Sequence, residues 1–147
     1  MTHNRPKPWG RTDNWVSRGI VLSTVTQIKL HEAVQVNHDR LDALYGEMDP
    51  TNAEDVVCRA MEELALRLAH CDRLYRKGEL DDLRRAAKSM IAIADQIGMD
   101  VLAHVASDVV RCAKARDQVA LAATLGRLMR TGEGSLSAIW DLQNITL

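Results

Sequence analysis

A basic cluster near the middle of the chain is the first candidate for a functional site. Arg84, Arg85 and Lys88 fall on the side of a predicted helix that faces away from its apolar residues. That side carries six candidate partner-binding residues: Arg84, Arg85, Lys88, Ser89, Ala92 and Asp95. Its cations make it a candidate binding surface. The simpler interpretations are a solvated helix face, or local ion pairs of the two arginines with Asp81 and Asp82.

Histidine and cysteine supply the other reactive groups. His70 directly precedes Cys71, and His104 lies one step off the apolar stripe of its predicted helix. Either imidazole could accept a phosphoryl group, and the plainer interpretation is a histidine at the edge of the core. Their spacing with Cys71 and Cys112 is not that of a closed tetrahedral zinc site, so we expect no metal. Without a G-x-S-x-G, P-loop or H-E-x-x-H motif, we expect no enzymatic activity and no cofactor.

Length and composition limit what these residues can belong to. A chain of 147 residues has the length of one domain with a single core. Hydrophobic residues make up 46% of the sequence and Phe is absent, so the core must use Leu, Val, Ile, Met and Ala, which favours helix packed on helix. The formal net charge of −1 gives no overall field that would attract nucleic acid, which we exclude as a partner.

The number of cysteines and the lack of a long apolar run indicate the cellular compartment in which the protein is expected. Cys58, Cys71 and Cys112 are odd in number and form no C-x-x-C pair, which indicates free thiols in a reducing compartment. No run of about 18 apolar residues occurs, and no charged-then-apolar leader opens the sequence. We therefore expect a cytoplasmic protein without a membrane partner.

The order of segments predicts an arm followed by one helical domain. Residues 1–18 are rich in Pro and charge, which is typical of a mobile arm, and residues 19–147 form the domain. Residues 19–30 are rich in β-branched residues and suit a strand, but no second strand is expected that could pair with it. A short helix is expected within residues 31–48, ended by Asp49-Pro50.

Four longer helices are expected after this point, at about 52–77, 79–97, 100–114 and 117–143. Thr51 and Glu54 form a capping box for the first, Gly78 and Gly98 supply breaks, and Asp100 can cap the third. The fourth continues in phase through two glycines. Because the connections are very short, neighbouring helices must be antiparallel, which predicts an up-down-up-down four-helix bundle in the all-α class.

Apolar stripes identify the expected core. The first long helix carries Val57, Met61, Leu64, Leu68, Cys71 and Tyr75, with Glu62, Arg67 and Arg73 outward. The second carries Leu80, Leu83, Ala87, Met90, Ala94 and Ile97. The third carries Leu102, Val105, Val109 and Cys112, and the last carries Ala122, Leu125, Met129, Gly132, Leu136 and Ile139.

From about Val36 to its end, the chain resembles the histidine-containing phosphotransfer (HPt) domains of bacterial phosphorelays. The resemblance rests on a helix that leads through Arg76-Lys77-Gly78-Glu79 to Ala87, and on a helix that ends in Ile97-Gly98. It implies a four-helix bundle preceded by a short helix. The family motif A-H-x-L-K-G-x-x-x-x-L/I-G reads here as Ala87-Lys88-Ser89-Met90-Ile91-Ala92, then Ile97-Gly98.

One departure from the motif changes the implied chemistry. Lys88 stands where the family has its phosphoacceptor histidine, and Ile91 and Ala92 stand where it has Lys and Gly. An imidazole offers a free lone pair at neutral pH. An ordinary lysine has a pKa near 10.4, so only about one molecule in 2,500 is unprotonated at pH 7. The resemblance therefore implies a non-phosphorylatable module that docks a receiver domain or sensor kinase, with Lys88 near the acidic, Mg²⁺-binding pocket of the receiver.

A purely structural or homo-oligomerising helical protein is the alternative. Gly132, Gly134 and Trp140, with the apolar tail of residues 145–147, could form a homodimer patch, since Trp is enriched at interfaces. Trp140 could equally fill the end of its own bundle.

Overall fold

Five α-helices make up residues 36–145, the part of the chain that the computed structural model describes. They are α2 (His38–Glu47), α3 (Pro50–Lys77), α4 (Leu80–Gln96), α5 (Asp100–Ala115) and α6 (Gln118–Ile145). No strand occurs in this range, so the all-helical class expected from the sequence is confirmed. The four long helices begin and end within two residues of their expected bounds. The expected arm, the segment 19–30 and residues 31–35 lie outside the described residues.

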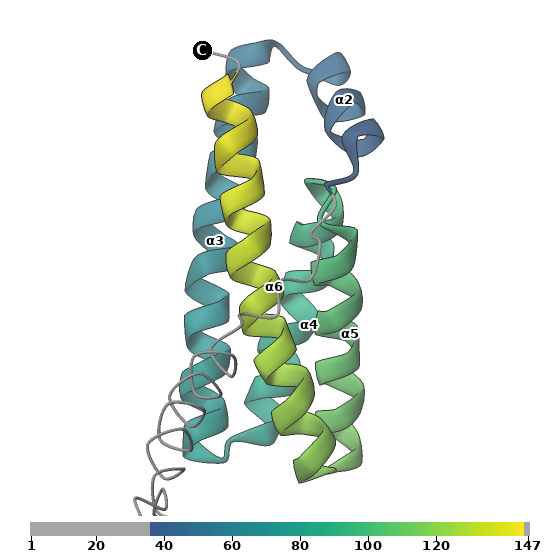
Figure 1. Cartoon of the computed structure of the whole chain (residues 1–147), viewed down its shortest axis with the longest axis vertical. Coiled ribbons are helices and arrows are strands. Elements are labelled where there is room, and N and C mark those ends of the chain that lie inside the picture. Colours follow the sequence, from purple (N-terminus) through teal and green to yellow (C-terminus); the bar gives the residue numbers. More distant parts are fainter. Residues whose placement is uncertain (1–35, 146–147) are drawn as a thin grey trace, which may run out of the picture. The chain divides into compact units, whose positions relative to one another are not determined.

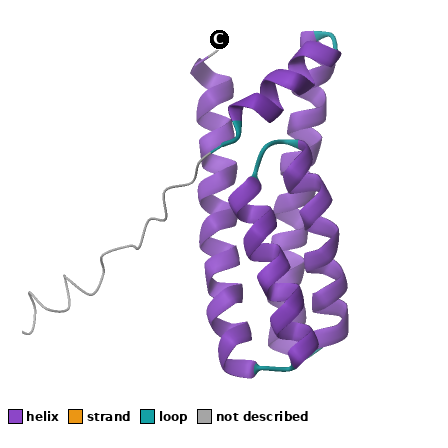
Figure 2. Ribbon diagram, turned by 90° about the vertical axis from the view of Figure 1, so that its right-hand side faces the viewer, coloured by secondary structure: helices purple, strands orange, loops and turns teal. Residues whose placement is uncertain are grey.

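The four longer helices lie side by side (Figures 1 and 2). α4 packs on α3 and α5, and α6 likewise packs on α3 and α5, so α4 and α6 are diagonal neighbours. α3 and α6 have 28 residues each, against 17 in α4 and 16 in α5. The shorter pair leaves the upper parts of α3 and α6 uncovered in Figure 1, and α2 lies at that level. None of the described helices is both long and apolar enough to cross a membrane.

The core contains most of the expected apolar stripes. Every residue of the α4 stripe is buried: Leu80, Leu83, Ala87, Met90, Ala94 and Ile97. On α5, Leu102, Val105 and Val109 are buried and Cys112 is half-buried. On α3, Met61 and Tyr75 are only half-buried, because Ala60 and Leu74 take the inner positions beside them. Burial of these side chains is the main favourable contribution to folding.

α6 buries only half of its expected stripe, namely Leu125, Gly132 and Ile139. Ala122 is exposed, and Met129 and Leu136 are half-buried. The buried positions are Leu121, Leu125, Leu128, Thr131, Gly132, Ser135 and Ile139. α6 has apolar residues around much of its circumference, so its pattern does not define one inner side. The helix is continuous through Gly132 and Gly134, as expected.

Two expected helix caps are wrong. α3 begins at Pro50 with Asp49 as its N-cap and no side-chain capping bond, which places Thr51 inside the first turn. Proline is favoured at this first position because its fixed φ suits a helix and it lacks the N–H that would be unpaired. Asp100 is the first residue of α5 rather than its cap, and its Oδ2 accepts a hydrogen bond from Asn37 Nδ2 at 2.8 Å. Gly78 ends α3 in the left-handed conformation, as expected.

The start of α2 is attached to the turn between α4 and α5. The Asn37 backbone N–H donates to the Gly98 carbonyl at 2.8 Å, and the Asn37 Oδ1 accepts from the Arg40 N–H at 3.2 Å. Arg40 Nη1 donates to the Asp95 carbonyl at 3.3 Å. Gly98 has φ +77°, and an added Cβ would lie 2.6 Å from the Asn37 carbonyl oxygen. This turn therefore needs glycine both for its conformation and for the close approach of α2.

Gly132 lets α3 and α6 approach each other closely. A Cβ at this position would lie 2.9 Å from Leu68 Cδ2 and closer still to Cδ1. Leu68 is itself buried, so it has little room to move. We expect Gly132→Ala to lower the free energy of unfolding by about 1–2 kcal/mol, since the overlap outweighs the gain in helix propensity. Urea unfolding followed by circular dichroism measures this.

Gly126 provides the matched control in the same helix. An added Cβ there would meet only Arg130 Nη1 at 3.5 Å, an ordinary contact. Gly126→Ala should therefore raise the free energy of unfolding by about 0.5–1 kcal/mol. If both substitutions stabilised the protein equally, the close α3–α6 approach at Gly132 would be wrong.

Candidate functional site

α4 presents the six candidate residues on the sides that its core stripe leaves free. We call this set the α4 surface: Arg84, Arg85, Lys88, Ser89, Ala92 and Asp95. Arg85, Lys88 and Ala92 are exposed, and the other three are half-buried. The core side of α4 packs between α3 and α5, which fixes the direction in which the α4 surface faces.

Lys88 is the exposed cation at the centre of this surface. It lies one helical turn after Arg84, and neither side chain forms an ion pair with a described residue. Two like charges one turn apart repel each other by a few tenths of a kcal/mol. The pair therefore gives this part of α4 a positive charge that a partner could neutralise.

Arg85 and Arg84 differ in their pairing. Arg85 Nη2 contacts Asp82 Oδ1, as one of the plainer interpretations expected. Asp81 instead lies 3.7 Å from Arg116 Nη2, in the turn between α5 and α6, so it does not pair with Arg84. Exposed pairs of this kind contribute between about 0 and 1 kcal/mol, so a docking partner could displace them at low cost.

Ser89 is held by its neighbours rather than offered to solvent. Its hydroxyl donates to the Ala86 carbonyl at 2.6 Å and accepts from Arg67 Nη1 of α3. Arg67 also pairs with Glu63 at 2.5 Å, and it is half-buried, so the expectation that it points outward is wrong. The Arg67 Nε is buried and has no hydrogen-bond partner among the described residues. Ser89 therefore contributes a small, fixed side chain to the α4 surface.

Arg67 is a neighbour of the α4 surface that the sequence did not indicate. The Glu63–Arg67 ion pair could be predicted from the sequence, because residues four apart lie one above the other on a helix. The contact with Ser89 depends on the register of α3 against α4, which no local pattern specifies.

A groove of about 440 Å³ runs along this contact between α3 and α4. It is lined by Arg67, His70, Leu74, Glu79, Asp82, Arg85, Ala86 and Ser89. His70 therefore opens onto the same groove as two residues of the α4 surface. Asp95 lies seven residues beyond Lys88, about 10 Å along the helix, so the structure does not bring it together with the cations.

His104 lies on α5, apart from the α4 surface. It is exposed, and its Nε2 lies 3.8 Å from Asp108 Oδ2. Asp108 also pairs with Arg111 at 2.6 Å and lies 4.0 Å from Arg127. This carboxylate is therefore shared by several cations rather than dedicated to His104.

The three cysteines differ in burial. Cys71 is buried, and its desolvation raises the pKa of its thiol to about 11, so it stays protonated at neutral pH. Cys58 is exposed and Cys112 is half-buried. Across residues 36–145, no three His, Cys, Asp or Glu side chains are grouped so as to hold a metal ion.

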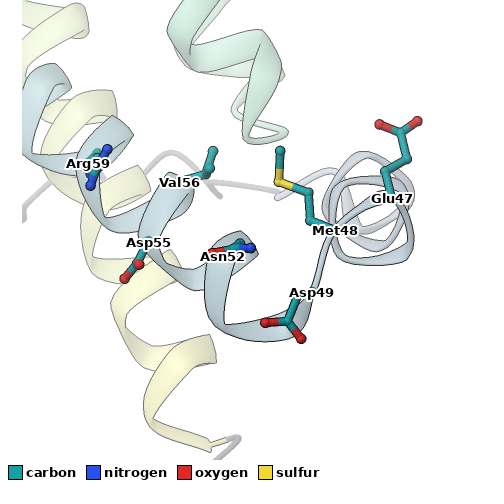
Figure 3. A pocket seen from close by; sticks show the side chains of 7 residues that line it. All are labelled: Glu47, Met48, Asp49, Asn52, Asp55, Val56 and Arg59. Carbon is teal, nitrogen blue, oxygen red and sulfur yellow. The ribbon is translucent and has the colours of Figure 1, made fainter.

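Another hollow, of about 480 Å³, lies at the corner between α2 and α3 (Figure 3). It is lined by Glu47, Met48, Asp49, Asn52, Asp55, Val56 and Arg59. Figure 3 shows that its charged side chains point in different directions instead of converging on one point. None of these residues belongs to α4, so this hollow is separate from the α4 surface.

A third hollow, of about 260 Å³, is more apolar and lies between α2, α3 and α6. Leu41, Val57, Ile139 and Leu142 line it, together with Tyr45. Burial is the largest effect on the phenol of Tyr45 and raises its pKa, so this side chain stays neutral. The lining of this hollow is completed by His38, Asp42, Glu54 and Gln143. None of its residues belongs to α4, so this hollow too lies apart from the α4 surface.

Comparisons with known proteins found no family, curated protein or solved structure that is similar to this chain.

Proposed function

We propose that this chain is a phosphorelay docking module that binds a receiver domain or sensor kinase through the α4 surface. In this proposal, the four long helices form an HPt-like up-down-up-down bundle, and the protein works in the bacterial cytoplasm. The observation that carries the proposal is the position of Lys88. It occupies the phosphoacceptor frame of the resemblance, it is exposed, and it has no ion-pair partner among the described residues.

The charge of Lys88 suits the partner that the resemblance implies. A receiver domain presents a pocket of aspartates that bind Mg²⁺ beside its phosphorylation site. An ammonium group placed at that pocket can form charge-assisted hydrogen bonds to the carboxylates. Arg84, one turn earlier, adds a second positive charge, and Ala92, one turn later, is small enough to let the partner approach closely.

The module occupies the receiver without receiving its phosphoryl group. A protonated ammonium has no lone pair with which to attack an aspartyl phosphate. Ile91 replaces the lysine of the family motif, so a second feature of the phosphotransfer site is also absent from this position. The expected effect of binding is therefore sequestration of the receiver.

We expect that incubation with a phosphorylated receiver leaves no acid-labile phosphate on this chain. The measurement uses radiolabelled phosphate, denaturing gels run at neutral pH and an authentic HPt domain as the positive control. Label that disappears in His70→Asn or His104→Asn would reveal a relay through another histidine and would contradict the non-phosphorylatable module. Both histidines are exposed, so these substitutions should leave the fold intact.

A further inference from the structure

The outer side of α6 is a second unpartnered surface. α6 packs on α3 and α5, and this side faces away from both. Eight residues recur on this side with alternating spacings of four and three, and we call this set the α6 face: Val119, Ala123, Gly126, Arg130, Glu133, Ser137, Trp140 and Asn144. All are exposed except Gly126, which is half-buried. An average spacing of 3.5 residues is the period with which helices pair in coiled coils.

Two large apolar side chains lie near the ends of the α6 face. Val119 is 82% exposed and Trp140 is 59% exposed. Between them, Ala123, Gly126 and Ser137 are small enough to accommodate a large side chain from another molecule. Gly132, which the homodimer patch expected from the sequence included, is buried against Leu68 and does not belong to this surface.

The middle of the α6 face carries one charge of each sign. Arg130 and Glu133 are exposed, and neither forms an ion pair within residues 36–145. The two charges become complementary to each other when two copies of α6 pair in antiparallel orientation. An antiparallel pairing centred between residues 131 and 132 places position 130 opposite 133, 126 opposite 137, and 123 opposite 140. Each arginine then meets a glutamate, and each Trp140 meets an alanine.

We propose that two copies of this chain associate through their α6 faces, antiparallel and related by a twofold axis between residues 131 and 132. Such an isologous contact uses the same residues twice, so the ion pair of Arg130 with Glu133 of the other copy forms on both sides of the axis. Parallel pairing in register would instead place like charges opposite each other. The charges therefore favour a second copy of this chain, in the antiparallel orientation, as the binding partner of the α6 face.

The contact is a modest one. α6 has 28 residues, which corresponds to a length of about 42 Å. Apart from Val119 and Trp140, the α6 face has only small, polar or charged side chains, so the contact buries little apolar surface. The copies should therefore be in a reversible, concentration-dependent equilibrium of monomer and dimer.

This inference does not depend on the proposed receiver docking. α4 and α6 are diagonal neighbours, so pairing through α6 leaves the α4 surface of each copy free. If both hold, the dimer presents two docking surfaces. Loss of dimerisation should leave receiver binding by a single copy unchanged, and loss of receiver binding should leave the dimer unchanged.

Sedimentation equilibrium of the full chain over a range of concentrations tests the pairing. We expect Arg130→Glu and Glu133→Arg each to weaken self-association by at least about tenfold, because each places like charges together twice. The double variant R130E/E133R should restore it, and an equimolar mixture of the two single variants should form mixed dimers. Arg73→Glu changes an exposed arginine of α3 by the same charge and should have no effect.

Two results would overturn the proposal. One is a wild-type chain that stays monomeric up to millimolar concentration. The other is a dimer whose strength is the same in Arg130→Glu, Glu133→Arg and the wild type, which would place the contact on another surface. Circular dichroism of every variant checks that the helices are retained, and the restored dimer of the double variant is itself evidence that the fold is intact.

Discussion

Replacing Gly98 by alanine is expected to lower the free energy of unfolding by about 2–4 kcal/mol and to detach α2 from the α4–α5 turn. The φ of +77° is strained for any residue with a Cβ, and that Cβ would lie 2.6 Å from the Asn37 carbonyl oxygen. A backbone atom cannot move aside as the end of a flexible side chain can. The start of α2 must therefore shift, which breaks the hydrogen bond from the Asn37 N–H to the Gly98 carbonyl.

Gly78→Ala separates the cost of placing a Cβ at positive φ from the cost of its steric overlap with the Asn37 carbonyl oxygen. Gly78 has a φ of +74°, close to that of Gly98, but an added Cβ would meet no atom within 4 Å. It should cost only the conformational strain, about 1–2 kcal/mol. Urea unfolding of both variants gives the difference, and amide hydrogen exchange at Asn37 should accelerate in Gly98→Ala alone. Equal losses of stability with unchanged exchange at Asn37 would show that α2 is not held at this turn.

α4 shows how far the sequence predicts the structure when one side of a helix is clearly apolar. All six residues of its expected stripe are buried. Lys88 was expected to be exposed because it lies off that stripe, and it is exposed. A strong period of 3.6 residues leaves only one way to bury the helix, so both the core and the orientation of the α4 surface follow from the pattern.

α6 shows where such a pattern is insufficient. Leu121 and Leu128 are buried in place of the expected Ala122 and Met129. The helix offers apolar residues on adjacent sides, and the inner side is chosen by how α3 and α5 fit against it. The contact of Gly132 with Leu68, which lies more than sixty residues away in sequence, is part of that fit.

The details around the α4 surface depend on contacts of the same long-range kind. Arg67 was expected to point outward, but it reaches Ser89 because α3 and α4 pack in one particular register. Thr51 and Glu54 match a capping box, yet α3 begins two residues earlier than expected, at Pro50, so Thr51 lies inside the helix. Local signals therefore predicted which residues are candidates, but not their partners. The role of the surface in a phosphorelay stays a prediction.

Lys88→Glu should weaken binding of a receiver domain by about 10- to 100-fold, which corresponds to about 1.4–2.7 kcal/mol. The substitution places a carboxylate against the acidic pocket where the proposal places an ammonium group. Lys88 is exposed and has no ion-pair partner in the described part of the chain, so the fold should not change. Lys77→Glu makes the same change of charge at an exposed position at the end of α3, and it should alter the affinity less than about twofold.

The most direct test is calorimetric titration of a receiver domain into the wild type, Lys88→Glu and Lys77→Glu. The receiver domains of the native host are first screened for capture by the wild-type chain, and the domain captured most strongly is titrated. We expect the wild type and Lys77→Glu to bind the receiver domain with similar affinity. Binding by Lys88→Glu should be lost or strongly reduced. Capture of no receiver domain, or equal affinity of all three proteins, would contradict docking through the α4 surface.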